Sequence, residues 1–366
     1  MLDDAKASGP MKIEKLTFIP HRLKRRGRWQ TASYTADFVD VFYVEIQTDD
    51  GVTGIGAGSV VPNGRGDPFM AGVETIKAAA GDLFARKDPL QISPLIDALD
   101  VAVRGYKRHK AGVELALYDL MGKSLNVSLS TLLGGATRDV IPVIRMLSLG
   151  SPAEMAETAS KFVQQGYQHL KVKLGTEPAG DLERFKAVRS AVGPQVTLTV
   201  DFNGAYDAAT AIKVIESLVP QGLAMVEQPV PGTDLTGMAA VTQAVEPVVL
   251  ADQAVESSRE VFQVAAANGA KAVSIKLLKF GGLQKSLAAA RVCEAAGLIC
   301  HVGGMATSSL IDAAQVHFIS ATPSVVTPCE VGEFAALDDD LVEGLKIDNG
   351  HVRVPTGPGL GVSLRV

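Results

Sequence analysis

The chain has 366 residues, of which 47% are hydrophobic and 20% are charged. This composition is typical of folded globular proteins and too apolar for a disordered chain. The formal net charge of −5 provides no overall positive field for gripping nucleic acid, so no nucleic-acid partner is expected. No apolar run approaches the ~18 residues of a membrane span, and three cysteines without a CxxC spacing favour a reducing cytoplasm. The length suggests about two domains or one large barrel with additions.

The first part of the chain carries strand patterns followed by helix patterns. Residues 1–10 lack the basic and apolar segments of a secretory signal and are expected to be a disordered leader. Residues 11–138 are expected to form an α+β domain, with helices covering one antiparallel sheet. The predicted strands are Lys12–Ile19, Val39–Gln47 and Val52–Ser59, and the predicted helices are Met70–Arg86 and Lys110–Ser124.

Residues 139–330 repeat one unit, a short apolar strand followed by a turn and an amphipathic helix. Apolar strands that alternate with helices indicate a parallel sheet buried on both faces. Eight such strands over ~190 residues are typical of a (β/α)8 barrel, with a doubly wound open sheet as the alternative. The predicted strands are Pro142–Leu149, His169–Leu174, Thr197–Phe202, Ala224–Gln228, Val248–Asp252, Ala272–Leu278, Leu298–Val302 and Ser324–Cys329. Residues 331–366 are expected to return to the first domain.

Acidic residues end three successive predicted strands, namely Asp201, Glu227 and Asp252. One strand–helix unit separates each from the next, so all three are expected at the same height in the barrel mouth. Like charges gathered at one place repel unless a cation lies among them. Oxygen ligands without histidine or cysteine favour Mg²⁺, with Mn²⁺ next. Taken singly, each acid could instead be a helix cap or a turn residue.

Lysines flank these acids. Lys171 and Lys173 are two apart on the second strand of the barrel and therefore face the same side, whereas Lys276 lies on the sixth strand. Lys173 and Lys276 could thus remove a proton from one face of a bound molecule and return one to the other. The charge of Lys171, at roughly 6 Å, is expected to lower the pKa of Lys173 by roughly 2 units. Lys279 is expected in a surface loop.

Together these motifs resemble a known family. The KxK of Lys171–Lys173, the three acids, Lys276 ahead of Gly281–Gly282, and the segments ALYDLMGKSL (116–125) and LLGG (132–135) are similar to the enolase superfamily, muconate lactonizing enzyme subgroup. The resemblance implies an α/β fold, a modified (β/α)7β TIM-type barrel with an N-terminal α+β capping domain, and a homo-oligomer. The site it implies has Mg²⁺ on Asp201, Glu227 and Asp252, the acid/base pair Lys173 and Lys276, Lys171 tuning Lys173, and Asn203 and Gln253 beside the metal ligands.

In the family that the chain resembles, specificity comes from two loops of the capping domain and from the end of the eighth strand. The first loop here is the basic segment Arg22–Gln30, whose cations would suit a substrate with a second carboxylate; a solvated basic loop is the alternative. The second loop is Val61–Gly66, and a further basic cluster, Arg104–Lys110, is expected at the surface. The residues expected to contact substrate are Arg25, Arg28, Trp29, Met305 and Glu330.

The reaction implied by the resemblance removes the proton next to a carboxylate and stabilises the resulting enolate with the metal. We therefore expect a Mg²⁺-dependent isomerase of a small-molecule carboxylate. It would be either a muconate-type cycloisomerase or a racemase or epimerase of an acidic or N-modified amino acid. An acid dehydratase and a non-catalytic barrel are the alternatives.

Two features of the last strands refine this expectation. The D-x-D of the family's dipeptide epimerases is absent from PCEVGE at 328–333, which argues against that reaction. His301, on the seventh strand, is expected to be packed or hydrogen-bonded and not to act as a base.

Overall fold

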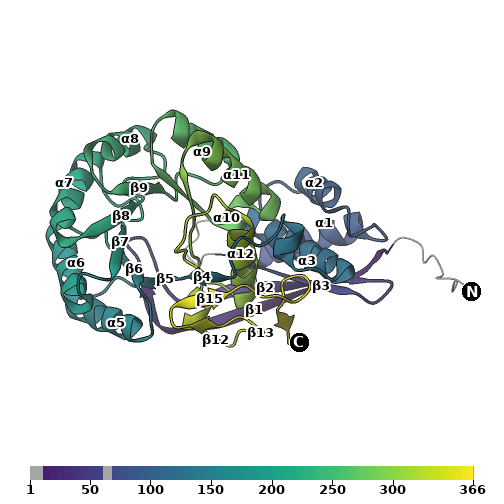
Figure 1. Cartoon of the computed structure of the whole chain (residues 1–366). Coiled ribbons are helices and arrows are strands. Elements are labelled where there is room, and N and C mark those ends of the chain that lie inside the picture. Colours follow the sequence, from purple (N-terminus) through teal and green to yellow (C-terminus); the bar gives the residue numbers. More distant parts are fainter. Residues whose placement is uncertain (1–10, 61–67, 366) are drawn as a thin grey trace, which may run out of the picture.

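The computed structural model describes residues 11–60 and 68–365. The expected leader, residues 1–10, and the expected second specificity loop, Val61–Gly66, lie outside the described residues. Within them, the chain forms an antiparallel sheet covered by helices and a ring of parallel strands surrounded by further helices (Figure 1).

The capping sheet consists of β1 (Ile13–Gln30), β2 (Thr35–Thr48) and β3 (Thr53–Val60), in the order β12-β1-β2-β3. The expectation that Arg22–Gln30 forms a loop is wrong. This segment is the second half of β1 and pairs with β2 as far as Gln30 opposite Thr35, with a register shift between Lys24 and Trp29. Because successive side chains of a strand point to opposite faces, only some of its cations can face the barrel.

Three helices pack on the capping sheet: α1 (Phe69–Phe84), α2 (Ile92–Ala102) and α3 (Lys107–Leu125). They bury an apolar core that includes Phe42, Val44 and Leu117. Helix α3 lies so close to β3 that a Cβ at Gly56 would overlap the carbonyl oxygen of Gly112, so glycine is required there. A short helix, α4 (Leu129–Leu132), leads to the barrel.

The ring is a parallel sheet in the order β11-β10-β9-β8-β7-β6-β5. Its strands are β5 (Ile144–Leu147), β6 (His169–Lys173), β7 (Thr197–Asp201), β8 (Leu223–Glu227), β9 (Val248–Ala251), β10 (Ala272–Ile275) and β11 (Ile299–Val302). The helices between and after them are α5 (Pro152–Gln164), α6 (Pro178–Val192), α7 (Ala208–Leu218), η1 (Val219–Gln221), α8 (Leu235–Ala244), α9 (Ser258–Ala266), α10 (Leu277–Phe280), α11 (Leu283–Ala296) and α12 (Ser309–Ala321). Figure 1 shows α5 to α9 as an outer arc around the ring, with α1 to α3 beside it.

The expected eighth strand, Ser324–Cys329, is not a regular strand. It closes the ring by isolated parallel bridges, one between Val325 and Cys300 and one between Cys329 and Val143. No helix follows it before the chain leaves the ring, so the architecture is a (β/α)7β barrel and the doubly wound open sheet is excluded.

After the barrel, the chain forms short elements that touch both parts of the molecule. They are η2 (Glu333–Ala336), β12 (Leu337–Asp338), β13 (Val342–Glu343), β14 (Ile347–Asp348), β15 (His351–Arg353) and β16 (Ser363–Leu364). Strand β12 pairs with β1 at Lys24 and Arg25, whereas β15 pairs with β4 (Val140–Pro142) at the entrance to the barrel. The tail therefore holds in place the half of β1 that carries Arg25.

Two contacts fix the capping sheet and its helices on the barrel. The end of β1 is joined to the end of β5, because Gln30 N donates to Ser148 Oγ at 2.8 Å and Leu149 N donates to Gln30 O at 2.9 Å. Glu114 of α3, which is 1% exposed, accepts hydrogen bonds from the amides of Leu283 and Gln284 at the start of α11. Burial raises the pKa of Glu114 to about 7, although both amide hydrogen bonds act in the opposite direction.

Among the described helices, none combines the length and apolarity needed to cross a bilayer.

The raised pKa of Glu114 predicts a pH dependence of stability. Between its ordinary pKa of 4.5 and its folded pKa of about 7, the folded chain holds a proton that the unfolded chain has lost. The free energy of unfolding should therefore fall with rising pH in this window, by on the order of 3 kcal/mol from this group. Urea unfolding at pH 5 and pH 8 measures this change. Between these two pH values, the free energy of unfolding of Glu114→Gln should fall less than that of the wild-type protein.

The matched control is Glu154→Gln, because Glu154 also accepts a backbone amide at a helix start but is exposed. Between pH 5 and pH 8, the free energy of unfolding of this control should fall as much as that of the wild-type protein. If it falls as much in Glu114→Gln too, Glu114 is already ionised at pH 5.

Candidate active site

Charged side chains line the barrel interior where five neighbouring strands end. Strand β6 contributes Lys171 and Lys173, β7 ends at Asp201 and β8 ends at Glu227. Lys173 is the register partner of Asp201, which in turn is the register partner of Glu227. Asp252 follows β9 directly and Lys276 follows β10 directly, so the order across five adjacent strands is lysine, aspartate, glutamate, aspartate, lysine.

Lys171 lies among three carboxylates in the barrel interior. Its Nζ is 2.7 Å from Glu227 Oε2, 2.6 Å from Glu330 Oε2 and 3.8 Å from Asp201 Oδ2. Burial acts to lower the pKa of Lys171, but these carboxylates outweigh it and raise the pKa well above its usual value. Lys171 is therefore a permanent cation that offsets the repulsion among the acids.

Lys173 and Lys276 stand at the two ends of the acid row. Lys173 forms an ion pair with Asp201, and its Nζ lies 3.5 Å from Asn203 Oδ1. Lys276 Nζ is 2.8 Å from Asp252 Oδ1 and 3.9 Å from Glu227 Oε1. Burial acts to lower the pKa of Lys276, but Asp252 and Glu227 outweigh it and raise the pKa.

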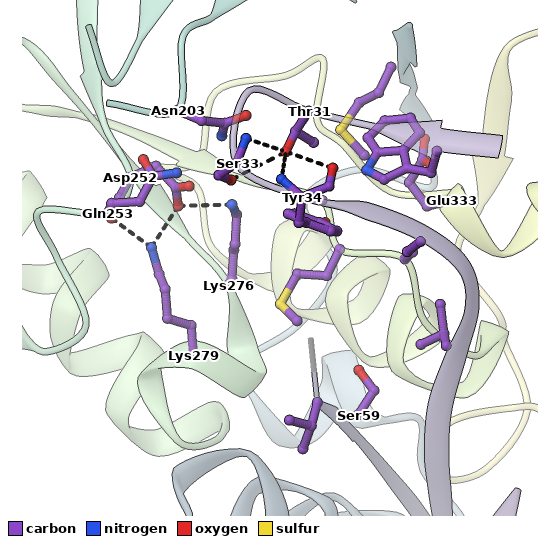
Figure 2. A pocket seen from close by; sticks show the side chains of 18 of the residues that line it. Thr31, Ser33, Tyr34, Ser59, Asn203, Asp252, Gln253, Lys276, Lys279 and Glu333 are labelled. Atoms are coloured by element: carbon purple, nitrogen blue, oxygen red, sulfur yellow. Dashed lines mark hydrogen bonds and ion pairs between the residues drawn. The ribbon is translucent and has the colours of Figure 1, made fainter. Parts of the chain in front are cut away.

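Lys279 belongs to the same cluster, so its expected place in a surface loop is wrong. Its Nζ donates to the backbone oxygen of Asp252 at 2.8 Å and to Asp252 Oδ1 at 2.7 Å. The chain coils into α10 directly after Lys276, and this turn brings Lys279 back toward the end of β9 (Figure 2). Burial lowers the pKa of Lys279, and the charge of Lys276 adds to this effect against the attraction of Asp252.

Glu227 is the central acid and the least satisfied one. Burial raises its pKa to about 7, and the neighbouring charge of Asp201 acts in the same direction. Its Oε1 is fully buried and has no hydrogen-bond partner among the described residues. Within those residues the acids do not meet in the geometry of a metal site, because the ammonium groups of Lys171 and Lys276 lie between them. The set nevertheless offers only oxygen donors.

Two amide side chains support the acids. Asn203 donates from Nδ2 to Asp201 Oδ2 at 3.0 Å and from its backbone amide to Asp201 Oδ1 at 2.8 Å. Gln228, which the sequence reading did not single out, accepts the amide of Asp252 at 2.9 Å through Oε1. Both contacts orient an acid without adding charge.

Glu330, which was expected to contact substrate, is buried inside the barrel and is not among the residues that line the pocket. It contacts Lys171, accepts the amide of Gly304 at 2.8 Å, and lies 3.2 Å from His301 Nε2. Burial acts against ionisation of Glu330, but Lys171 and His301 outweigh it and lower its pKa. The expectation that His301 is hydrogen-bonded agrees with this contact.

A cavity of about 230 Å³ adjoins the cluster, and residues of the capping sheet line part of it. Lys173, Lys276, Asn203, Asp252 and Gln253 line its floor, and Arg25, Trp29, Tyr34, Arg108 and Met305 are among the residues that line its walls. Figure 2 shows Lys276 and Lys279 both directed at Asp252, opposite the turn that carries Thr31, Ser33 and Tyr34. The cavity has room for a small molecule only.

In the basic half of β1, some side chains face the pocket and others face the solvent. The Arg25 side chain is 4% exposed, lies 4.5 Å from the Trp29 ring centre and 3.6 Å from Glu333 Oε2. Burial lowers the pKa of Arg25, although Glu333 opposes this effect. Arg28, expected to contact substrate, is exposed and is not among the lining residues, because the register shift before Trp29 changes which side chains face the barrel.

Arg108 is a pocket residue that the sequence reading missed. The basic cluster Arg104–Lys110 was expected at the surface, but α3 begins at Lys107, and Arg108 in its first turn lines the pocket with Nη1 3.2 Å from Met305 Sδ. Helix α3 starts three residues earlier than predicted, and this earlier start places the Arg108 side chain over the barrel.

Comparisons with known proteins agree with this architecture. Residues 13–134 match the family described as mandelate racemase/muconate lactonizing enzyme, N-terminal domain, and residues 154–366 match the enolase C-terminal domain-like family. The chain belongs to the enolase superfamily. The resemblance to its muconate lactonizing subgroup is thereby confirmed, as is the TIM-type barrel with a capping domain.

Relatives within this superfamily have several activities. The chain is 30% identical to an N-succinyl-L-Arg/Lys racemase of Bacillus cereus over 97% of this chain and 96% of the relative, and the crystal structure of an N-succinyl Arg/Lys racemase from that organism has a TM-score of 0.93. It is 34% identical to a chloromuconate cycloisomerase of Delftia acidovorans over 88% of this chain and 89% of the relative. A dipeptide epimerase from Enterococcus faecalis, complexed with Mg and the dipeptide L-Leu-L-Tyr, is 29% identical with a TM-score of 0.92 and covers 96% of this chain and 99% of its own.

These enolase-superfamily relatives are all isomerases, and so is this protein. The alternative of a non-catalytic barrel is set aside.

Proposed function

We propose that the protein is a Mg²⁺-dependent racemase or epimerase of an N-acylated amino acid that carries a second acidic group. The observation that carries this proposal is that Lys173 and Lys276 line one pocket from the two ends of the same acid row. A base at one end and an acid at the other is the arrangement that inversion at a carbon requires.

Asp201, Glu227 and Asp252 would hold the metal. All three are buried and offer carboxylate oxygens, the donors that Mg²⁺ prefers, with Mn²⁺ as a substitute. The buried Oε1 of Glu227 supports this fit, because it has no hydrogen-bond partner among the described residues and such an oxygen is costly to leave without one. When bound, Mg²⁺ would stabilise the negative charge that gathers on the substrate carboxylate as the neighbouring proton leaves.

Lys173 and Lys276 would exchange the proton. One lysine, in its neutral form, takes the proton from the carbon, and the other, as an ammonium group, delivers a proton to the opposite face. The carboxylate beside each lysine is shared with a second cation, Asp201 with Lys171 and Asp252 with Lys279.

The end of the eighth barrel segment favours an N-acylated substrate over a free amine. Glu330 is engaged by Lys171 and His301, and Glu333 is engaged by Arg145 and Arg25. Both acids of this segment are thus already paired with cations of the protein, in keeping with the missing D-x-D. A substrate whose nitrogen is acylated carries no charge there and needs no acidic partner.

The cations on the wall favour a second carboxylate. Arg25, which lines the cavity, shares one carboxylate, Glu333, with Arg145, which is not among the lining residues, and all three side chains are buried. A buried positive charge in excess beside a cavity is stabilised by an anionic ligand. Trp29 and Met305 would contact the apolar part of the same substrate.

A muconate-type cycloisomerase is the second candidate. The chain is 34% identical to a chloromuconate cycloisomerase, and muconate is a dicarboxylate that the same excess charge would attract. Such a reaction would need only one of the two lysines, so the paired arrangement favours racemisation or epimerisation. An acid dehydratase ranks after both.

We further propose a reducing cytoplasm as the cellular setting, since Cys293, Cys300 and Cys329 are all free thiols. Assembly into a homo-oligomer is proposed on the family resemblance.

The proposed reaction predicts exchange of the substrate's α-proton with solvent. Purified enzyme with Mg²⁺ would be screened in D₂O against N-succinyl and other N-acyl amino acids, dipeptides, proline derivatives and muconates. With a turned-over amino-acid derivative, deuterium should enter both enantiomers. Lys173→Ala and Lys276→Ala should each lower racemisation by about 10²–10⁴-fold, and each should retain exchange with one enantiomer only, the opposite one in the two variants.

Lys161→Ala is the control, because Lys161 is an exposed lysine paired with Glu157 on α5, and it should exchange as wild type does. Full racemisation in both active-site variants would rule out the two-lysine reaction. Turnover of muconates alone would favour the cycloisomerase.

The proposed second carboxylate predicts a specificity change in Arg25→Met. Loss of a hydrogen bond to a charged group costs about 1.5–3 kcal/mol, so kcat/KM for an N-succinyl substrate should fall about 10-fold to 150-fold. The same variant should act on the N-succinamyl analogue, whose terminal group is an uncharged amide, at the wild-type rate.

Arg28→Met is the matched control from the same strand and should leave both values unchanged, because Arg28 is exposed and is not among the residues that line the cavity. An equal fall for both substrates in Arg25→Met would mean that Arg25 has no role in recognising the terminal charge.

A further inference from the structure

The buried carboxylate of Asp181 lies outside the charged cluster of the active site. It joins two of the loops that follow the strands carrying that cluster. Asp181, at the start of α6, is fully buried. Its Oδ2 accepts the amide of Gly175 at 2.6 Å and the hydroxyl of Tyr206 at 2.7 Å. Its Oδ1 accepts Thr176 Oγ1 at 3.2 Å and Arg184 Nη1 at 3.1 Å. A carboxylate with four donors is fixed in position and fixes its donors in turn.

The donors come from the chain segments that follow two functional strands. Gly175 and Thr176 lie directly after Lys173 and Leu174 at the end of β6. Tyr206 closes the turn that begins after Asp201 at the end of β7 and includes Asn203. Its ring packs edge-on against Phe202, with ring centres 5.3 Å apart. Asp181 therefore ties the loop behind Lys173 to the loop behind Asp201.

The two loops are also in direct contact, so their positions depend on each other. Leu174 N donates to Asp201 O at 3.1 Å. Gly175 has a φ of +101°, and a Cβ there would lie 2.7 Å from Phe202 O and 3.2 Å from Ala32 of the capping domain. Arg184 extends the connection to a third loop, because its Nε donates to Gly150 O at 3.0 Å.

Lys276 is held by different means. It precedes α10, and the amide of Phe280 donates to its carbonyl oxygen at 3.0 Å. Neither Asp181 nor Tyr206 forms a hydrogen bond or ion pair with the segment from Lys276 to Phe280 among the described interactions. The hydrogen bonds of Asp181 and Tyr206 thus reach the loop behind Lys173 and not the segment that carries Lys276.

We propose that Asp181 and Tyr206 are positioning residues for Lys173 and Asn203, and that they set the rate of proton transfer on the Lys173 face of the substrate only. The inference rests on the proposed function, in which Lys173 and Lys276 serve opposite faces. Proton transfer is sensitive to displacements of about 1 Å, which can lower a rate about 10²-fold. Loss of one of the hydrogen bonds to Asp181 leaves the fold intact and loosens the loop behind Lys173.

The test uses Tyr206→Phe, which removes the hydroxyl and keeps the ring that packs on Phe202, together with Asp181→Asn. Lys173→Ala first identifies the enantiomer whose deuterium exchange depends on Lys173. For that enantiomer, Tyr206→Phe should lower the exchange rate about tenfold and Asp181→Asn about 10²-fold, with KM close to wild type. Exchange of the other enantiomer should change less than twofold.

A second measurement needs neither metal nor substrate. Hydrogen–deuterium exchange of backbone amides, followed by mass spectrometry, should show faster exchange in residues 174–180 and 203–207 of Tyr206→Phe. The matched control is Tyr43→Phe, because Tyr43 is also buried and its hydroxyl also donates to a carboxylate, Asp340 Oδ1 at 2.8 Å, away from both loops. It should leave the amide exchange of those residues and the ratio of the two enantiomers unchanged.

The outcomes separate this inference from the reaction on which it rests. A selective fall for the Lys173-dependent enantiomer, with faster amide exchange in both loops, supports it. The inference is overturned, while the two-lysine reaction stands, if substrate deuterium exchange falls equally for both enantiomers. It is also overturned if the backbone amides of both loops exchange as slowly as in the wild-type protein. A wild-type enzyme that exchanges neither enantiomer of any substrate overturns the proposed function and this inference together.

Discussion

The structure depends on charge balance among buried side chains inside the barrel. Lys171, Lys173, Lys276 and Lys279 face Asp201, Glu227, Asp252 and Glu330, and nearly all of these side chains are buried. An isolated charge in such a place would cost several kcal/mol, whereas a network in which every charge has an opposite neighbour is tolerated. Each strand of the barrel must therefore end at one height, because a shift of one residue would turn a charge toward the apolar helices.

This constraint explains why the centre of the site could be predicted from the sequence. Strand alternation places Lys171 and Lys173 on one side, and the strand–helix repeat places Asp201, Glu227 and Asp252 on neighbouring strands. Lys279 could not be placed in the same way, because its position depends on the short turn α10 after β10. The side chain returns to Asp252 by helical geometry that strand spacing does not contain.

The wall of the pocket was harder to predict because it is built from long-range contacts. Arg22–Gln30 has the composition of a loop, yet β2 on one side and β12 on the other hold it as a strand. That pairing decides that Arg25 faces the cavity and that Arg28 faces solvent. Arg108 reaches the same cavity only because the capping helices dock on the barrel, with Glu114 at the start of α11. The residues that we propose to select a substrate thus come from the contacts between the two parts, whereas the residues that we propose for proton transfer come from the barrel alone.

The central claim is that the acid row holds one divalent cation between the two lysines, and isothermal calorimetry with MgCl₂ tests it most directly. We expect one Mg²⁺ per chain in the wild-type protein and no measurable binding in Glu227→Gln, which removes the negative charge of the acid whose buried Oε1 has no hydrogen-bond partner among the described residues. Glu157→Gln, at an exposed surface pair, should bind as wild type does. Undiminished Mg²⁺ binding in Glu227→Gln, or no binding in the wild-type protein, would contradict the assignment of the site.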